Sequence, residues 1–255
     1  MRTVRVIPVL LLHERGLVKT RQFSHPAYLG DPINIVKIFN DKEVDELILL
    51  DITATVEKRP PQFEYLKEIV SECFMPVCYG GGLRTIEDVK RVFDMGVEKV
   101  ATNSYGLENP GFVSEVAGIY GSQSMVVSLD AKMERFGGYE LRTHGGRKRT
   151  GLLPVQFARE MEAAGAGEIL LNSIDRDGTM HGYDMDLIRQ VASAVSVPLI
   201  ACGGAGKIED LYNVVKQGGA AAAAAGSMFV YQGRHRAVLI SYPSYDELEK
   251  LFAKA

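Results

Sequence analysis

The stretch MPVCYGGGLRTIED at residues 75–88 has a counterpart later in the chain, VPLIACGGAGKIED at residues 197–210. In both copies a hydrophobic segment containing proline leads into glycines and then into an Ile-Glu-Asp triplet. Leu49-Leu50-Asp51 has a similar counterpart in Leu170-Leu171-Asn172. Similarity at a fixed spacing indicates internal repetition. The sequence therefore predicts two repeated halves, at about residues 1–122 and 123–255.

Short apolar segments alternate with longer amphipathic ones such as Thr85–Met95 along the whole chain. Eight of the apolar segments are bounded by glycine or polar residues: Val4–Leu12, Leu47–Asp51, Pro76–Tyr79, Lys99–Thr102, Met125–Asp130, Glu168–Asn172, Pro198–Cys202 and Ala220–Ala225. Continuous apolar runs are typical of strands that are buried on both faces. The last segment is rich in alanine and also fits a helix, but the eightfold regularity favours a strand. We therefore expect an α/β fold, a (β/α)8 TIM barrel built from two half-barrel repeats.

Length and charge restrict the class of protein. A chain of 255 residues suits one domain, residues 1–255, and its net charge of −3 argues against binding to nucleic acid or anionic membranes. No apolar run approaches the length that spans a membrane, and the N-terminal segment is interpreted as a strand rather than a signal peptide. Three cysteines are too few for a disulfide framework, which indicates a cytoplasmic protein. The histidines lack metal-ligand spacing, so neither a metal nor a cofactor is expected.

Glycines and small polar residues follow several predicted strands, where the functional groups of such barrels lie. Glycine lets backbone N–H groups approach an anion closely, so these turns predict two phosphate cradles. The first cradle would contain Gly82, Asn103 and Ser104. The second would contain Gly178, Gly204, Gly226 and Ser227, with Asp177 beside it. The alternative is that the glycines only form tight turns of the barrel.

Four acidic residues at strand ends are candidates for acid–base chemistry: Asp51, Asp130, Asp175 and Asp177. Asp130 closes an apolar run, so we expect it to point into the barrel mouth, where partial desolvation would raise its pKa. Alternatively, its carboxylate caps the following turn. By the internal repeat, the partner of Asp130 falls near Leu11, which is apolar.

Another set of charges stands at the starts of predicted strands: Arg5, Glu46, Lys99 and Glu168. Strand starts converge at the bottom of a barrel, so these residues form either a ring of salt bridges or four independent solvated charges. Spacing alone favours independent charges. The segment from Arg15 to Asp31, which contains Lys19, is long for a βα loop and is a candidate lid.

The chain resembles the cyclase subunit of imidazole glycerol phosphate synthase, a lyase of histidine biosynthesis, from Arg5 to about Phe229. The most specific blocks are Leu50-Asp51-Ile52-Thr53-Ala54, Gly80-Gly81-Gly82, Gly165-Ala166-Gly167-Glu168-Ile169-Leu170-Leu171, Ser173-Ile174-Asp175-Arg176-Asp177-Gly178-Thr179 and Gly203-Gly204-Ala205-Gly206-Lys207. Together these blocks are far more specific than any one of them.

The resemblance implies a heterodimer in which a glutaminase subunit docks beneath the barrel. Ammonia would then pass through the barrel to a bis-phosphorylated substrate at the top. The four strand-start charges would form the gate of this ammonia channel, which reverses the interpretation from spacing. Lys19, Asp51 and Asp177 would join the phosphate cradles in binding substrate, and Asp130 would transfer protons.

The chain departs from that family at Leu11, where the family has a second catalytic aspartate. Leucine cannot transfer a proton, so ring closure and cleavage should be strongly impaired. This replacement and the tail at residues 236–243 resemble a branch associated with surface polysaccharide (lipopolysaccharide) biosynthesis. That branch implies acetamidino-sugar formation with a third, amidotransferase-type protein. One alternative is a genuine histidine-pathway cyclase that forms imidazole glycerol phosphate and AICAR, and another is a non-catalytic ammonia conduit or scaffold.

Overall fold

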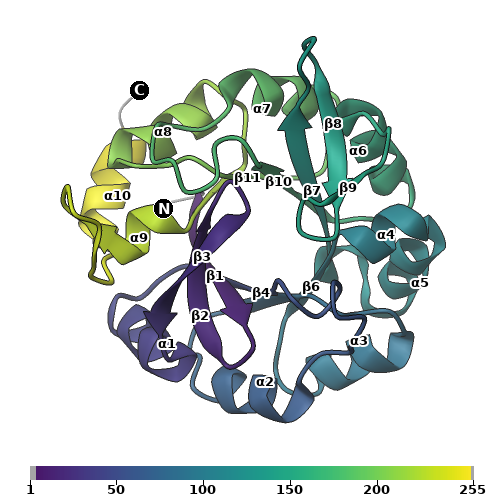
Figure 1. Ribbon diagram of the computed structural model, residues 1–255, viewed down its shortest axis with the longest axis horizontal. Coiled ribbons are helices and arrows are strands. Elements are labelled where there is room, and N and C mark those ends of the chain that lie inside the picture. Colours follow the sequence, from purple (N-terminus) through teal and green to yellow (C-terminus); the bar gives the residue numbers. More distant parts are fainter. Residues whose placement is uncertain (1–3, 254–255) are drawn as a thin grey trace.

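A computed structural model describes residues 4–253 and contains a closed barrel of parallel strands surrounded by helices (Figure 1). The barrel strands are β1 (Arg5–His13), β4 (Leu47–Asp51), β5 (Val77–Gly80), β6 (Lys99–Thr102), β7 (Met125–Met133), β10 (Glu168–Ser173), β11 (Leu199–Cys202) and β12 (Ala222–Ala225). Each pairs in parallel with the next in this order, and β12 pairs with β1 to close the ring. The (β/α)8 prediction is confirmed.

Helices cover the outside of the barrel (Figure 1). They are α1 (Pro32–Asp41), α2 (Phe63–Val70), α3 (Ile86–Phe93), α4 (Ser104–Glu108), α5 (Pro110–Tyr120), α6 (Pro154–Ala163), α7 (Met185–Ala192), α8 (Ile208–Lys216), α9 (Ser227–Val230) and α10 (Tyr245–Phe252), with a 3-10 turn, η1 (Ser122–Ser124). The local sequence explains why several of these helices begin where they do. Thr85 and Asp88 form a capping box at the start of α3. Proline occupies the first turn of α1, α5 and α6. Across residues 4–253, no helix is long and apolar enough to span a membrane.

Alternation along the strands divides the core into two clusters. The larger cluster lies between the strands and the helices and includes Val6 and Leu10 of β1. The smaller one fills the barrel interior and contains Ile7 and Val9 of β1 with Ile48, Cys78, Ala101, Val126, Leu170, Ile200, Cys202, Ala222 and Ala224. The alanine-rich segment is a fully buried strand, as the eightfold pattern predicts.

Two hairpins extend the barrel strands at the mouth. After β1 the chain forms β2 (Gly16–Arg21) and β3 (Ser24–Gly30), and after β7 it forms β8 (Tyr139–Thr143) and β9 (Lys148–Arg149). The long connection from Arg15 to Asp31 pairs for most of its length as an antiparallel hairpin, which the sequence pattern did not predict. The cause is that β1 continues past its barrel neighbours to His13 and offers its free edge to β2. A short ribbon, β13 (Tyr231–Gln232) and β14 (Ala237–Val238), precedes α10.

Candidate functional site

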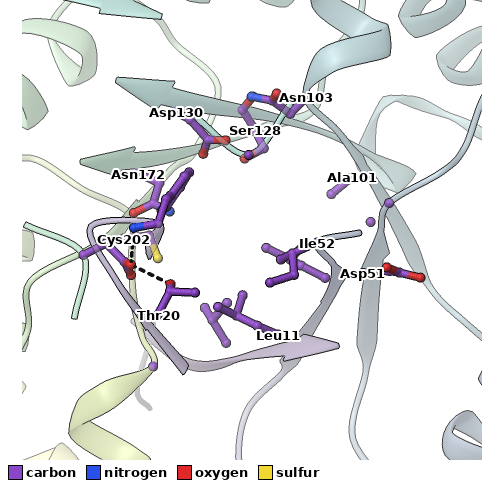
Figure 2. A pocket seen from close by; sticks show the side chains of 18 of the residues that line it. Leu11, Thr20, Asp51, Ile52, Ala101, Asn103, Ser128, Asp130, Asn172 and Cys202 are labelled. Carbon is purple, nitrogen blue, oxygen red and sulfur yellow. Dashed lines mark hydrogen bonds between the residues drawn. The ribbon is translucent and has the colours of Figure 1, made fainter. Parts of the chain in front are cut away.

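A cavity opens at the carboxyl ends of the barrel strands, and residues from every strand or from the position just after it line the walls (Figure 2). Both predicted cradles border this one cavity, as do Lys19, Asp130 and Asp177. The placement follows from the fold, because all eight parallel strands end at the same face of the barrel.

Asp130 and Leu11 face each other across this cavity (Figure 2). Asp130 is half-buried and accepts no hydrogen bond from residues 4–253. Burial and, secondarily, the negative charge of Asp177 raise the pKa of Asp130 to about 7. Leu11 lies beside Ile52 on the opposite wall (Figure 2). The mouth therefore has one wall with a carboxyl group whose pKa is raised to about 7 and an opposite wall that is apolar.

Asp51 borders the cavity, but its carboxylate points away from it (Figure 2). Its Oδ1 accepts hydrogen bonds from the backbone N–H groups of Thr53 and Ala54, and its Oδ2 lies 2.9 Å from Nη1 of Arg59. The reason is strand alternation: Leu50 faces the interior, so its neighbour Asp51 faces outward. The structure thus gives the Asp51 carboxylate a place in the loop after β4, not one in the cavity where substrate binding was expected.

Lys19 reaches from the β2–β3 hairpin into the mouth, where its Nζ donates a hydrogen bond of 2.5 Å to the carbonyl oxygen of Val9. The pairing of β1 with β12 ends at Pro8 and Ala225, which leaves that carbonyl available. Burial lowers the pKa of Lys19 to about 8, although the nearby Asp177 carboxylate favours the charged form. The hairpin therefore delivers a buried amine beside the second cradle.

Asp177 holds this hairpin in place. Its carboxylate accepts hydrogen bonds from the Thr20 hydroxyl at 2.9 Å and from the Phe23 N–H at 3.3 Å, and its carbonyl oxygen accepts one from the Gln22 N–H. Burial raises the pKa of Asp177, and these contacts partly oppose that rise. Asp175, in contrast, accepts a bond from the Met133 N–H and serves the loop structure.

The first cradle is tied closely into the barrel. The Asn103 amide donates to the Ser128 carbonyl oxygen at 2.9 Å, and its Oδ1 accepts a hydrogen bond from the Ser104 hydroxyl. The Ser104 Oγ also accepts a bond from the His144 N–H. Gly82 has a φ of 76°, and an added Cβ would lie 2.8 Å from the Arg59 carbonyl oxygen, so glycine is required there.

The second cradle has a tightly packed backbone and a hydroxyl group that no other described residue engages. Gly204 has a φ of 114°, and an added Cβ would lie 2.2 Å from the Gly182 carbonyl oxygen. Ser227 is buried, and within the described chain its hydroxyl forms no hydrogen bond. Gly178 is packed against the Thr20 carbonyl oxygen of the hairpin. An anion here would find a hydroxyl that no protein group engages.

The four strand-start charges form a closed ring at the opposite end of the barrel. Arg5 lies 2.5 Å from both Glu46 and Glu168, and Lys99 lies 3.1 Å from Glu46 and 2.9 Å from Glu168. Both glutamates are buried, so each needs its two cationic partners. The structure brings these residues together and does not leave them as independent solvated charges.

Comparison with known proteins agrees with this architecture. The family model described as "Histidine biosynthesis protein" matches residues 5–236. The chain belongs to this family. A Pseudomonas aeruginosa protein named "Putative imidazole glycerol phosphate synthase subunit hisF2" is 50% identical over 245 residues, 96% of this chain and 98% of that protein. A Leptospira borgpetersenii protein named "Putative imidazole glycerol phosphate synthase subunit HisF" is 46% identical over 97% of this chain and 98% of that protein. A Vibrio vulnificus protein named "Putative imidazole glycerol phosphate synthase subunit hisF3" is 47% identical over 96% of this chain and 95% of that protein.

Two cavity residues of this histidine biosynthesis family barrel were missed by the sequence reasoning. Asn172 is the register partner of Asp130, and its Oδ1 is buried with no hydrogen-bond partner in the described chain. The internal repeat offered a signal, since Asn172 matches Asp51. Arg147 also lines the cavity, and the glycine pair that precedes it was a signal. Residues 4–253 contain no cluster suited to a metal ion.

Proposed function

We propose that this chain is the barrel subunit of a glutamine-dependent amidotransferase that acts on a phosphorylated substrate in the cytoplasm. A glutaminase subunit would dock beneath the barrel and release ammonia at its base. The observation that carries the proposal is the closed ring of Arg5, Glu46, Lys99 and Glu168 at one end of a barrel whose other end holds Asp130. A substrate would bind at the mouth, and the ring would gate the entry of ammonia.

The mouth supports chemistry on a molecule with two phosphate groups. Glycine turns and small polar residues border the cavity in both halves of the barrel, and each cradle would hold one phosphate. Asp130 would lie between them and could take or give a proton near neutral pH, because burial raises its pKa to about 7. Lys19 would bind the substrate from the hairpin.

The apolar residue Leu11 favours an acceptor of ammonia other than the histidine-pathway substrate. The wall formed by Leu11 and Ile52 contains no group that transfers a proton, and Asp51 is engaged by Arg59. We therefore propose that the ammonia serves acetamidino-sugar formation in surface polysaccharide biosynthesis, together with a third, amidotransferase-type protein. Family membership supports the alternative of histidine synthesis, in which the products are imidazole glycerol phosphate and AICAR. The apolar wall supports the second alternative, a non-catalytic ammonia conduit.

One assay separates these functions. The purified barrel is incubated with an ammonium salt and the histidine-pathway substrate, and product formation is compared with that of an ordinary histidine-pathway member of the family. The proposal expects turnover more than tenfold lower, whereas comparable turnover would establish the histidine-pathway alternative. In the complete system with glutaminase and sugar acceptor, Asp130→Asn should abolish product formation. If that variant remains fully active, the barrel is a conduit.

A further inference from the structure

Arg147 lies in the turn between β8 and β9 and is one of the residues that line the cavity. Three residues before it have left-handed backbone conformations: His144 at φ 55°, Gly145 at 65° and Gly146 at 79°. Such a tight turn needs its glycines, because only glycine adopts this conformation without strain. Gly145 and Gly146 therefore allow the tight turn that places Arg147 at the mouth.

Arg147 differs from the other cations of the same hairpin. Arg142 and Arg149 both pair with Glu134 and Glu140, and Lys148 lies 2.8 Å from Glu108. Arg147 forms no ion pair or hydrogen bond with any part of the described chain. Of the four cations between residues 142 and 149, the one that borders the cavity is therefore the one without a carboxylate partner.

The turn is fixed next to the first cradle. The N–H of His144 donates to the Ser104 Oγ at 2.9 Å, whereas the Lys148–Glu108 pair on the far side of the turn is solvent-exposed and contributes little to its position. Gly146 packs closely against the ring of Phe23 at the tip of the other hairpin. A Cβ atom added to Gly146 would lie only 3.0 Å from Cδ2 of Phe23. Arg147 thus belongs to a turn that is hydrogen-bonded, through His144, to the cradle residue Ser104.

The charges of the cavity leave Arg147 available for a ligand. Asp177 lies near Lys19 on the side of the second cradle, and Asp51 is paired with Arg59 outside the cavity. Asp130 also lines the cavity, but burial raises its pKa to about 7, and it forms no ion pair with Arg147. The first cradle itself contributes only neutral groups, from Gly82, Asn103 and Ser104. A dianion bound there would otherwise lack a cation, whereas a guanidinium can contact two phosphate oxygens at once.

We propose that Arg147 is a binding residue for a phosphate monoester in the first cradle. This inference rests on the proposed function and deepens it, since it names the cation of one of the two phosphate sites. Each half of the barrel then supplies the mouth with one cation from its hairpin, Lys19 from the first half and Arg147 from the second. The two hairpins would hold a ligand that is anionic at both ends.

The test is a titration with inorganic phosphate, followed through backbone amide resonances by NMR. The amides of Gly82 and Ser104 report on the first cradle, and those of Gly204 and Ser227 report on the second. In Arg147→Gln the affinity reported by the first pair should fall at least fivefold, while that reported by the second pair should stay within twofold. Lys148→Gln, which removes an equal charge from the same turn, is the matched control and should change neither affinity by more than twofold.

The outcomes separate this inference from the proposed function. If phosphate binds both cradles of the unaltered protein and Arg147→Gln binds it equally well, the assignment of Arg147 is overturned and the proposed function stands. An equal loss in Lys148→Gln overturns it too, because the effect is then one of general charge. If neither cradle of the unaltered protein responds to phosphate, the phosphate sites of the proposed function fail together with the assignment. Arg147→Lys should give an intermediate affinity, since it keeps the charge without the planar fork.

Discussion

The amino group of Lys19 occupies the space that a side chain at position 226 would need. A Cβ atom added to Gly226 would lie 2.2 Å from Nζ and 2.8 Å from Cε of Lys19. The backbone of Gly226, with φ −110°, does not itself require glycine. Glycine at this position therefore serves the lysine rather than the chain conformation.

Gly226→Ala should displace the Lys19 amine from the mouth. Because the colliding atoms are the end of a flexible side chain, we expect the free energy of unfolding to change by no more than about 1 kcal/mol. The displaced amine regains solvent, so the pKa of Lys19 should rise from about 8 toward the value of an ordinary lysine. The pH dependence of Lys19 labelling by an amine reagent, measured by mass spectrometry, checks this. An unchanged labelling profile would contradict the packing described here.

Asp130→Asn should stabilise the protein at high pH and not at low pH. The folded-state pKa is about 7 and the unfolded value is about 4, so the folded state holds the proton more tightly between these values. Stability is therefore lost as the pH rises through 7, by at most about 4 kcal/mol. We expect the variant to exceed the unaltered protein by about 1–3 kcal/mol at pH 8 and to match it near pH 4. Urea denaturation at pH 8 and pH 4 measures the difference in free energy of unfolding between the two proteins. An equal difference at both pH values would contradict the raised pKa of Asp130.

Lys99→Ala should alter ammonia transfer between subunits. Glu46 and Glu168 would each lose one cationic partner, which should cost about 1–3 kcal/mol of stability. In the complex with glutaminase, the ratio of glutamine-dependent to ammonia-dependent product formation should change at least threefold. Lys90→Ala is the control, because its pair with Asp94 is exposed and away from the ring. If the ratio stays constant in Lys99→Ala, the ring is a stabilising feature and not a gate.

Leu11→Asp should increase activity on the histidine-pathway substrate. The new carboxylate would face Asp130 across the cavity and supply a second proton-transfer group, typically worth about 10²–10⁴-fold. Since the local wall is apolar, we expect partial recovery, at least about tenfold over the unaltered protein with ammonium as nitrogen source. Leu11→Asn changes polarity without adding an ionisable group and should give no recovery. Equal rates in both variants would remove Leu11 as the explanation.

The sequence predicted the strands better than the connections between them. Apolar runs bounded by glycine identify strands buried on both faces, including the alanine-only β12, whose regular spacing outweighed its helix propensity. The hairpin after β1 was not predicted, because Ser24–Gly30 is mostly exposed and its pattern lacks an apolar face. Its pairing depends on the free edge of β1, which is a tertiary feature.

The orientation of side chains at strand ends was the hardest part of the site to predict. Asp51 and Asp130 both close apolar runs, yet one carboxylate points outward and the other into the mouth. In a strand buried on both faces, hydrophobicity does not reveal which alternate residues face the barrel axis. The ring at the base had the same difficulty, since its residues could be located at strand starts but their inward direction required the closed barrel.

The ring at the base contains two cations and two anions, so it is electrically neutral as a whole. Because its net charge is zero, the ring adds little long-range field of its own, so it would not concentrate ammonium or other cations at the base of the barrel. The four side chains of the ring form ion pairs with one another. An ion that entered the ring would lose its water of hydration and would find no unpaired charge to replace it. Uncharged ammonia is under no such demand, and selectivity of this kind would depend little on the ionic strength of the cell.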